Sequence, residues 1–211
     1  MSVIVAVVAK PNDGLRPYVL MGSDSLHIGK IISEDGRSLV EYSRDEDFKK
    51  VHRVNNKLIG MAGHFDSSIT HSFLDYVERN DEEILVLSQK LLIFLEEAFI
   101  KKPIEIKQRC TVLVASCDHG DPIVTKLVVD EADMSSANVE VIRLEAHGFY
   151  PAFIGASGLE DLELKFVKRT LDSNANYNIL AMKKAVNAYL LEAAARRSDI
   201  CNQNIKIEKL T

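Results

Sequence analysis

Long apolar runs are absent from this 211-residue sequence. The run from Val3 to Ala9 has seven apolar residues, far short of the roughly 20 that a membrane-spanning helix needs. A secretory signal is not expected either, because no Lys or Arg precedes Val3 to form its basic start. The sequence therefore predicts a soluble protein that does not enter a membrane.

Cysteine and excess positive charge are also scarce. The three cysteines, Cys110, Cys117 and Cys201, are widely spaced; they form neither a metal-ligand pattern nor an even disulfide set, which favours a reducing cytoplasm. The net charge of −5 argues against a nucleic-acid-binding protein, which usually carries a basic face. His119 lies between two aspartates, but a polar turn is a better interpretation than a metal site, so we expect no metal.

Low-complexity tracts, long linkers and internal repeats are missing, so residues 1–211 are predicted to form one domain. Blocks of strands and blocks of helices alternate along it. Strands are predicted as a hairpin over 3–23, as a pair around an Asn55-Asn56 turn, and at 110–116, 122–130, 138–146, 150–156 and 204–210. Helices are predicted at 69–77, 84–99, 159–171 and 177–196. Residues 28–47 are polar and predict a surface excursion with a turn at Glu34-Asp35-Gly36.

This block order does not suit a doubly wound parallel sheet, in which single strands alternate with single helices. It favours an α+β fold, a four-layer αββα sandwich in which two mostly antiparallel sheets pack face to face between two helix layers. The apolar run at 3–9 fits this arrangement, because a strand covered on both faces need not alternate apolar and polar residues.

Several short motifs stand in a specific order: a strand beginning directly after residue 2, "GSDS" closing the second strand, "KKVHRV" followed by "LIGMAG", then "FIGASG" and "RRSDIC". In this order and spacing the chain resembles the N-terminal nucleophile hydrolases, and within them the proteasome β-subunits and bacterial HslV-type peptidases. The resemblance covers nearly the whole chain.

The resemblance implies that the nucleophile is the first residue of the mature chain and that its own α-amino group is the base. The residue in that position is Ser2, once Met1 is removed; most of the family has threonine there. An α-amino group, with a pKa of about 7.7–8.0, is well suited to take a proton near neutral pH. Serine keeps the hydroxyl but loses the methyl group that restricts the side chain.

The resemblance also assigns roles to four further catalytic positions. Asp24 matches the acidic residue that holds the catalytic lysine, and Lys50 matches that lysine. Gly63 matches the glycine whose N–H points at the oxyanion. Asp199 matches the residue that helps to position the terminal amine, whereas Ala156 stands where the family usually has a serine, a departure that favours a weakened or inactive enzyme.

Three residues, His27, Met61 and Phe65, fall near positions that line the primary specificity pocket of the family. Met61 and Phe65 would favour an apolar residue before the scissile bond, but filling of the core is the favoured interpretation, because Met and Phe routinely fill cores.

The function expected from the resemblance is cleavage of peptides or unfolded proteins by a cytoplasmic homo-oligomeric ring, without a cofactor and with an ATP-dependent unfoldase as partner. Apolar helix faces at 69–99 predict subunit contacts. Two alternatives remain: a small-amide acylase of the same superfamily, and a non-catalytic ring or scaffold protein that retains the fold.

Overall fold

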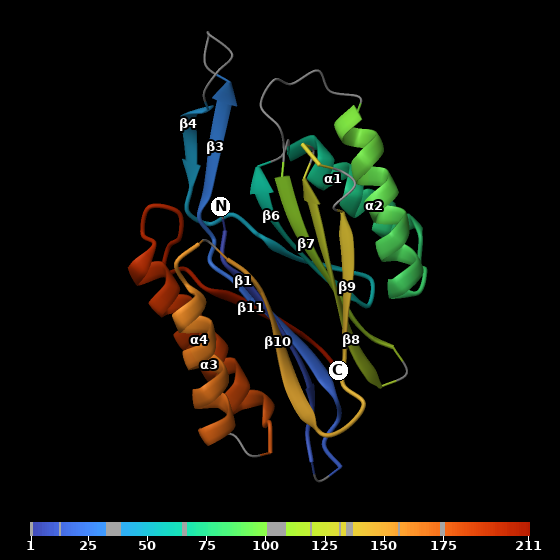
Figure 1. Ribbon diagram of the computed structural model, residues 1–211, viewed down its shortest axis with the longest axis vertical. Helices are drawn as coiled ribbons and strands as arrows, with labels where there is room; N and C mark the ends of the chain where they lie inside the picture. The colour runs from blue at the N-terminus through green and yellow to red at the C-terminus, as the bar shows by residue number, and fades with distance from the viewer. Residues whose placement is uncertain are drawn as a thin grey trace.

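The computed structural model describes residues 2–12, 14–32, 39–64, 67–100, 109–118, 120–130, 132–133, 137–155, 157–173 and 176–211. Two antiparallel sheets lie face to face at its centre (Figure 1). One has the order β10 (Gly148–Ile154), β1 (Ile4–Lys10), β2 (Tyr18–Ser23) and β11 (Lys206–Leu210). The other has the order β5 (Val51–Val54), β6 (Lys57–His64), β7 (Arg109–Asp118), β8 (Asp121–Asp130) and β9 (Asn138–Arg143).

A pair of helices covers the outer face of each sheet (Figure 1). The helices α1 (Ser67–Arg79) and α2 (Ile84–Ile100) cover the five-stranded sheet, and α3 (Glu160–Ser173) and α4 (Ile179–Arg196) cover the four-stranded sheet. This is the predicted four-layer sandwich. Within the described residues no helix is long and apolar enough to cross a membrane.

The strand β1 lies inside the four-stranded sheet, paired with β2 on one side and β10 on the other. Its odd-numbered residues from Val3 onward pack in the cluster under α3 and α4, whereas Ile4, Ala6 and Val8 pack in the cluster between the sheets. Both faces of the strand are therefore buried. This explains the continuous apolar run, because each side-chain position meets a different apolar layer.

The predicted polar excursion at 28–47 contains regular structure. The strands β3 (His27–Ile32) and β4 (Leu39–Asp45) form a separate antiparallel pair, with an irregular register between Gly29 and Lys30. Figure 1 shows this pair extending away from the sandwich. The predicted turn at Glu34-Asp35-Gly36 lies outside the described residues, as does His119.

Smaller differences concern the ends of elements. The strand β6 continues past Gly63 to His64, and β9 ends at Arg143 although the prediction ran to residue 146. Among the described residues, no group of His, Cys, Asp or Glu side chains could hold a metal ion.

Candidate active site

A buried ion pair between Asp24 and Lys50 lies at one end of the sandwich. Asp24 follows the last residue of β2 and Lys50 precedes the first residue of β5, so the pair joins the two sheets. The Lys50 Nζ atom donates to both Asp24 carboxylate oxygens at 2.8 Å. Only 2% of the Lys50 side chain and 1% of the Asp24 side chain are exposed. Burial lowers the pKa of Lys50, and the neighbouring Asp24 carboxylate opposes part of that shift.

The same carboxylate holds the beginning of β1. The Val3 N–H donates to Asp24 Oδ1 at 3.3 Å, and the Leu26 N–H donates to Oδ2 at 3.0 Å. Ser2, which is half-buried, is the residue directly before Val3. One carboxylate thus fixes the backbone beside Ser2 and the ammonium group of Lys50.

Asn202 is a further residue of this region, and motif matching did not single it out. Its Oδ1 accepts from the Ser25 N–H at 3.1 Å, and its Nδ2 donates to the Glu46 carbonyl at 2.7 Å. The Ser25 hydroxyl donates to that same carbonyl at 2.7 Å. Asn202 therefore ties the segment after Asp24 to the segment that leads to Lys50. Its only sequence signal is its place just after "SDIC".

Cys201 lies close to the ion pair but is not a competing nucleophile. Its side chain is buried. Burial and the negative charge of Asp24 raise the pKa of the thiol to about 12. A cysteine attacks as the thiolate, so this side chain is inert near neutral pH.

Of the predicted pocket residues, His27 feels the charge of the ion pair. Its ring stacks on Phe48 with 4.4 Å between ring centroids. Burial lowers its pKa, and the positive charge of Lys50 lowers it further. Met61 is 6% exposed and belongs to the core cluster beneath α1 and α2, so it fills the core. Phe65 lies outside the described residues.

The free energy of unfolding should fall as the pH drops below about 6.5, the ordinary pKa of histidine. The unfolded chain then binds a proton that folded His27 resists, so acid favours unfolding. His52, whose pKa burial also lowers, acts in the same direction. Denaturant unfolding at pH 5 and pH 7 should show this fall, and His27→Phe should reduce it. If the free energy of unfolding falls as much in His27→Phe as in the unmodified protein, His27 does not cause the pH dependence.

Comparison with solved structures finds the same architecture along nearly the entire chain. The crystal structure of eukaryotic HslV from Trypanosoma brucei aligns over 98% of this chain and 98% of its own, with a TM-score of 0.51 and 16% identity. The chain has the HslV fold. BPH from Thiobacillus denitrificans, solved in complex with epoxomicin, aligns over 98% of this chain and 97% of its own, with a TM-score of 0.55 and 14% identity. No family model and no curated protein matches the sequence.

Within this HslV fold, Asp199 lies on the turn after α4, and its carboxylate forms a salt bridge with Arg197. Arg197 donates to its two carboxylate oxygens at 3.0 and 2.9 Å, and a third nitrogen of Arg197 donates to the Ser157 carbonyl at 3.1 Å. Arg197 therefore ties the turn before α3 to the segment that carries Asp199. The neighbouring Ala156 lies outside the described residues.

Gly63 has a backbone conformation that residues with a side chain rarely adopt, with φ of +142°. It pairs with Cys110 of β7. A Cβ atom placed on Gly63 would lie 2.1 Å from the Arg109 carbonyl oxygen and 2.7 Å from the Cys110 Cα atom. Both contacts are with backbone, so glycine is required here for the close approach of β6 and β7.

Gly63→Ala should lower the free energy of unfolding by about 2–5 kcal/mol, because overpacking and backbone strain add. Gly14→Ala is the matched control: Gly14 also has a positive φ, of +71°, but a Cβ atom there meets nothing within 4 Å. Urea unfolding of both variants measures the difference. Equal losses in the two variants would show that contact with β7 does not make Gly63 necessary.

Proposed function

We propose that this protein is a proteasome-like peptidase whose nucleophile is the hydroxyl of Ser2 after Met1 has been removed. The observation that carries the proposal is the shared carboxylate of Asp24, which binds the Val3 N–H at 3.3 Å and the Lys50 ammonium at 2.8 Å. A buried ion pair tied to the backbone next to Ser2 supplies a rigid surrounding for a nucleophile there, and the Lys50 ammonium is its positively charged member.

In the proposed reaction, the Ser2 hydroxyl attacks the carbonyl carbon of a peptide bond while the free α-amino group of Ser2 takes the hydroxyl proton. The amine then gives this proton to the leaving nitrogen. An ester joins the acyl part of the substrate to Ser2, and a water molecule, deprotonated by the same amine, hydrolyses it. The Gly63 N–H would donate to the negatively charged oxygen of each tetrahedral intermediate.

Lys50 has an electrostatic role in this proposal. Its ammonium group favours the anionic form of a nearby hydroxyl and lowers the proton affinity of a nearby amine. Asp24 keeps Lys50 in place and balances its charge. His27 would border the pocket for the residue before the scissile bond, together with Phe65, and Asp199 would help to position the terminal amine.

The proposal includes a cytoplasmic homo-oligomeric ring that receives peptides or unfolded chains from an ATP-dependent unfoldase. Reaction with a β-lactone tests the nucleophile, because a hydroxyl opens the lactone ring and the enzyme gains the whole mass of the probe. The native protein should lack Met1 in its intact mass and should carry one adduct, on Ser2. An adduct on another residue, with Ser2 unmodified, would reject Ser2 as the nucleophile.

A second candidate function is a non-catalytic subunit with the same fold. The observation that favours it is the salt bridge of Asp199, whose two oxygens both accept from Arg197 and are thus engaged elsewhere than at an amine. This function predicts that the native protein retains Met1 and does not react with the lactone.

A further inference from the structure

Two neighbouring arginines stand at the end of α4. Arg196 is the last residue of the helix, and Arg197 caps it. The Arg197 carbonyl accepts from the N–H groups of Ile200 and Cys201 at 3.0 and 2.8 Å. The backbone of Arg197 therefore fixes the turn at 197–201, which carries Asp199.

This turn lies against the beginning of β1. Its last residue, Cys201, belongs to the same buried cluster as Val3, the residue after Ser2. The next residue, Asn202, accepts from the Ser25 N–H at 3.1 Å, so the turn is also bound to the segment that follows β2. The turn is thus fixed close to the proposed nucleophile.

The Asp199 carboxylate interacts with two positive charges. The Arg197 side chain donates to its two oxygens at 3.0 and 2.9 Å. These hydrogen bonds lower the pKa of Asp199, and the positive charge of the chain terminus lowers it as well. Because Arg197 neutralises most of the negative charge of Asp199, little of that charge is left to act on the terminal amine.

A second contact holds the guanidinium group in place. A third nitrogen of Arg197 donates to the Ser157 carbonyl at 3.1 Å, so the side chain lies between two turns. Only 24% of this side chain is exposed, compared with 62% of the Asp199 side chain. Arg197 is therefore the rigid partner of the pair, and the carboxylate keeps an open side that another cation can approach.

Other titratable groups border this part of the site, and they come from every element that meets there. The positive charge of the chain terminus also reaches His27 of β3 and Cys201. Asp24 and Lys50 are paired with each other at 2.8 Å. The first turn of α3 contributes Glu160, which accepts from the Gly158 N–H at 3.2 Å, and Glu163. Asp199 differs from these groups because its charge is balanced by Arg197.

We propose that Arg197 is a positioning residue that neutralises the Asp199 carboxylate and so prevents it from holding the terminal amine of Ser2 as an ammonium ion. The inference rests on the proposed function, because this amine is the proposed base. A general base must be unprotonated to accept a proton, whereas a free carboxylate beside it favours the protonated form. Arg197 therefore keeps a larger share of the amine in the reactive form near neutral pH.

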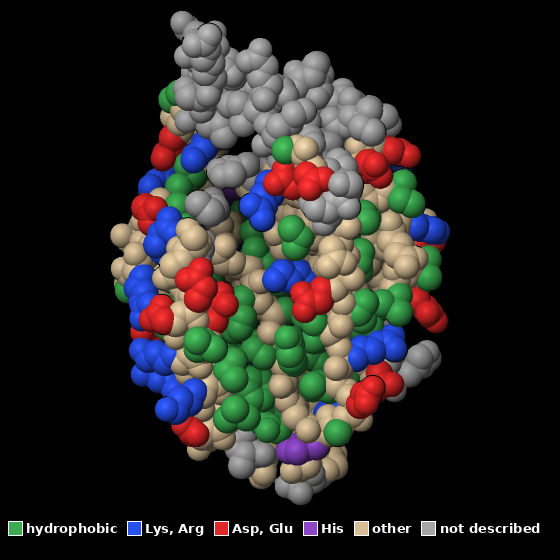
Figure 2. All heavy atoms as spheres, viewed as in Figure 1, with side chains coloured by type: hydrophobic (Ala, Val, Ile, Leu, Met, Phe, Trp, Pro, Cys, Tyr) green, Lys and Arg blue, Asp and Glu red, His purple; other side chains and the backbone are tan. Residues whose placement is uncertain are grey.

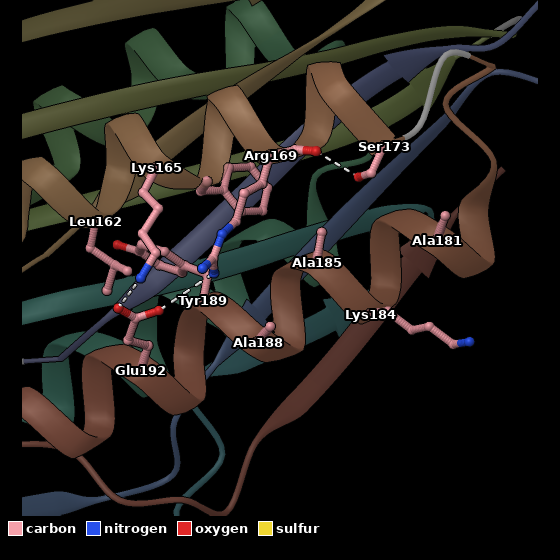
Figure 3. Close-up of a pocket in the computed structure, with 11 residues that line it drawn as sticks. Leu162, Lys165, Arg169, Ser173, Ala181, Lys184, Ala185, Ala188, Tyr189 and Glu192 are labelled. Atoms are coloured by element: carbon pink, nitrogen blue, oxygen red, sulfur yellow. Dashed lines mark hydrogen bonds and ion pairs between the residues drawn. The ribbon is translucent and has the colours of Figure 1, made fainter.

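Arg196 supplies a matched control. Its side chain donates to both Asp161 oxygens at 2.8 Å and to Glu192 at 3.2 Å. Figure 3 shows Lys165 and Arg169 of α3 directed toward the same Glu192. Along the left edge of Figure 2, where α3 and α4 lie, basic and acidic side chains stand close to one another. Loss of Arg196 thus removes the same charge from the neighbouring position, at a surface where other cations remain.

The pKa of the terminal amine tests the proposal without requiring catalysis. It is measured on the chain freed of Met1, from the pH dependence of acetylation of the amine by acetic anhydride, followed by mass spectrometry. Arg197→Gln removes the charge but keeps an amide donor for the Ser157 carbonyl, and it should raise the pKa by about half a unit to one unit. Arg197→Lys and Arg196→Gln should leave the pKa close to that of the unmodified chain. Equal values in Arg197→Gln and the unmodified chain would overturn the proposal.

A double variant tests whether Arg197 acts through Asp199. Arg197→Gln combined with Asp199→Asn lacks both the guanidinium group and the carboxylate, so the pKa of the amine should return to its value in the unmodified chain. A pKa that stays raised in the double variant would show that another group holds the ammonium ion, and the proposal would be wrong.

Peptide cleavage supplies a second readout. At pH 7 the rate of Arg197→Gln should fall about three- to tenfold, and the loss should shrink at pH 9, where more of the amine is neutral. An equal loss at both pH values would give Arg197 a purely structural role and overturn the proposal. A shifted amine pKa in a protein without peptidase activity would reject only the proposed function, whereas cleavage by Ser2 without the shift would reject only this inference.

Discussion

Lys50→Ala should lower the free energy of unfolding by about 3–5 kcal/mol, because removal of one partner leaves the other charge buried and unpaired. Only 1% of the Asp24 side chain is exposed, so water cannot replace the lost ammonium group. If the proposed function holds, the variant should also lose peptide cleavage, since nothing then favours the anionic form of the Ser2 hydroxyl. Urea unfolding and a peptidase assay measure the two effects separately.

Lys57→Ala is the matched control. Lys57 is equally buried, with 2% of its side chain exposed, but its partner Asp81 is 74% exposed. Loss of Lys57 therefore leaves a carboxylate in water, and both the loss of stability and the loss of activity should be smaller. Asp24→Asn combined with Lys50→Met should recover part of the stability lost in Lys50→Ala without recovering activity. Similar losses in Lys50→Ala and Lys57→Ala would contradict a special role for the Asp24–Lys50 pair.

Extra residues before Ser2 should lower the rate of peptide cleavage by about 10²–10⁴-fold relative to the processed chain, which is the usual contribution of a general base. An amide nitrogen at Ser2 cannot take a proton from the hydroxyl, whereas a free amine can. The chain should be produced with a removable leader directly before Ser2 and assayed before and after the leader is cut. The same comparison in Lys50→Ala controls for contaminating peptidases.

Equal rates with and without the leader would remove the amine from the mechanism. The hydrogen bond from the Val3 N–H to the Asp24 carboxylate fixes the backbone next to Ser2. This bond therefore restricts where the α-amino group of Ser2 can lie. A leader could still slow access to the site without touching the chemistry. The pH dependence separates these effects: only loss of the base abolishes the rise in rate as the pH passes the pKa of the amine.

The layers of this fold could be predicted because the apolar pattern of each strand indicates which of its faces are buried. The run from Val3 onward has no polar face, and the structure buries both faces of β1. The helices keep a regular apolar spacing because each meets a sheet on one side only. The β3–β4 pair gave no such signal: its residues mix polar and apolar types, and the pair stands outside the sandwich.

The contacts of the candidate site were less accessible to prediction. Asp24 and Lys50 could be named from short motifs, and the structure brings them together across 26 positions of sequence. The bond from Ser25 to Asn202 spans 177 positions, and an asparagine in a polar terminal segment has no local pattern that predicts its partner. The salt bridge of Arg197 with Asp199 is local, but a basic and an acidic residue two positions apart in the sequence seldom mark a site.

The rate of peptide cleavage by Ser2→Ala, compared with the unmodified sequence and with both proteins freed of Met1, tests the central claim most directly. Ser2→Ala keeps the free amine, the Asp24–Lys50 pair and the fold, and removes only the hydroxyl oxygen. The account predicts a loss of about 10³-fold or more, whereas Ser2→Thr keeps or improves the rate. A rate for Ser2→Ala equal to that of the unmodified chain would contradict the claim that Ser2 is the nucleophile.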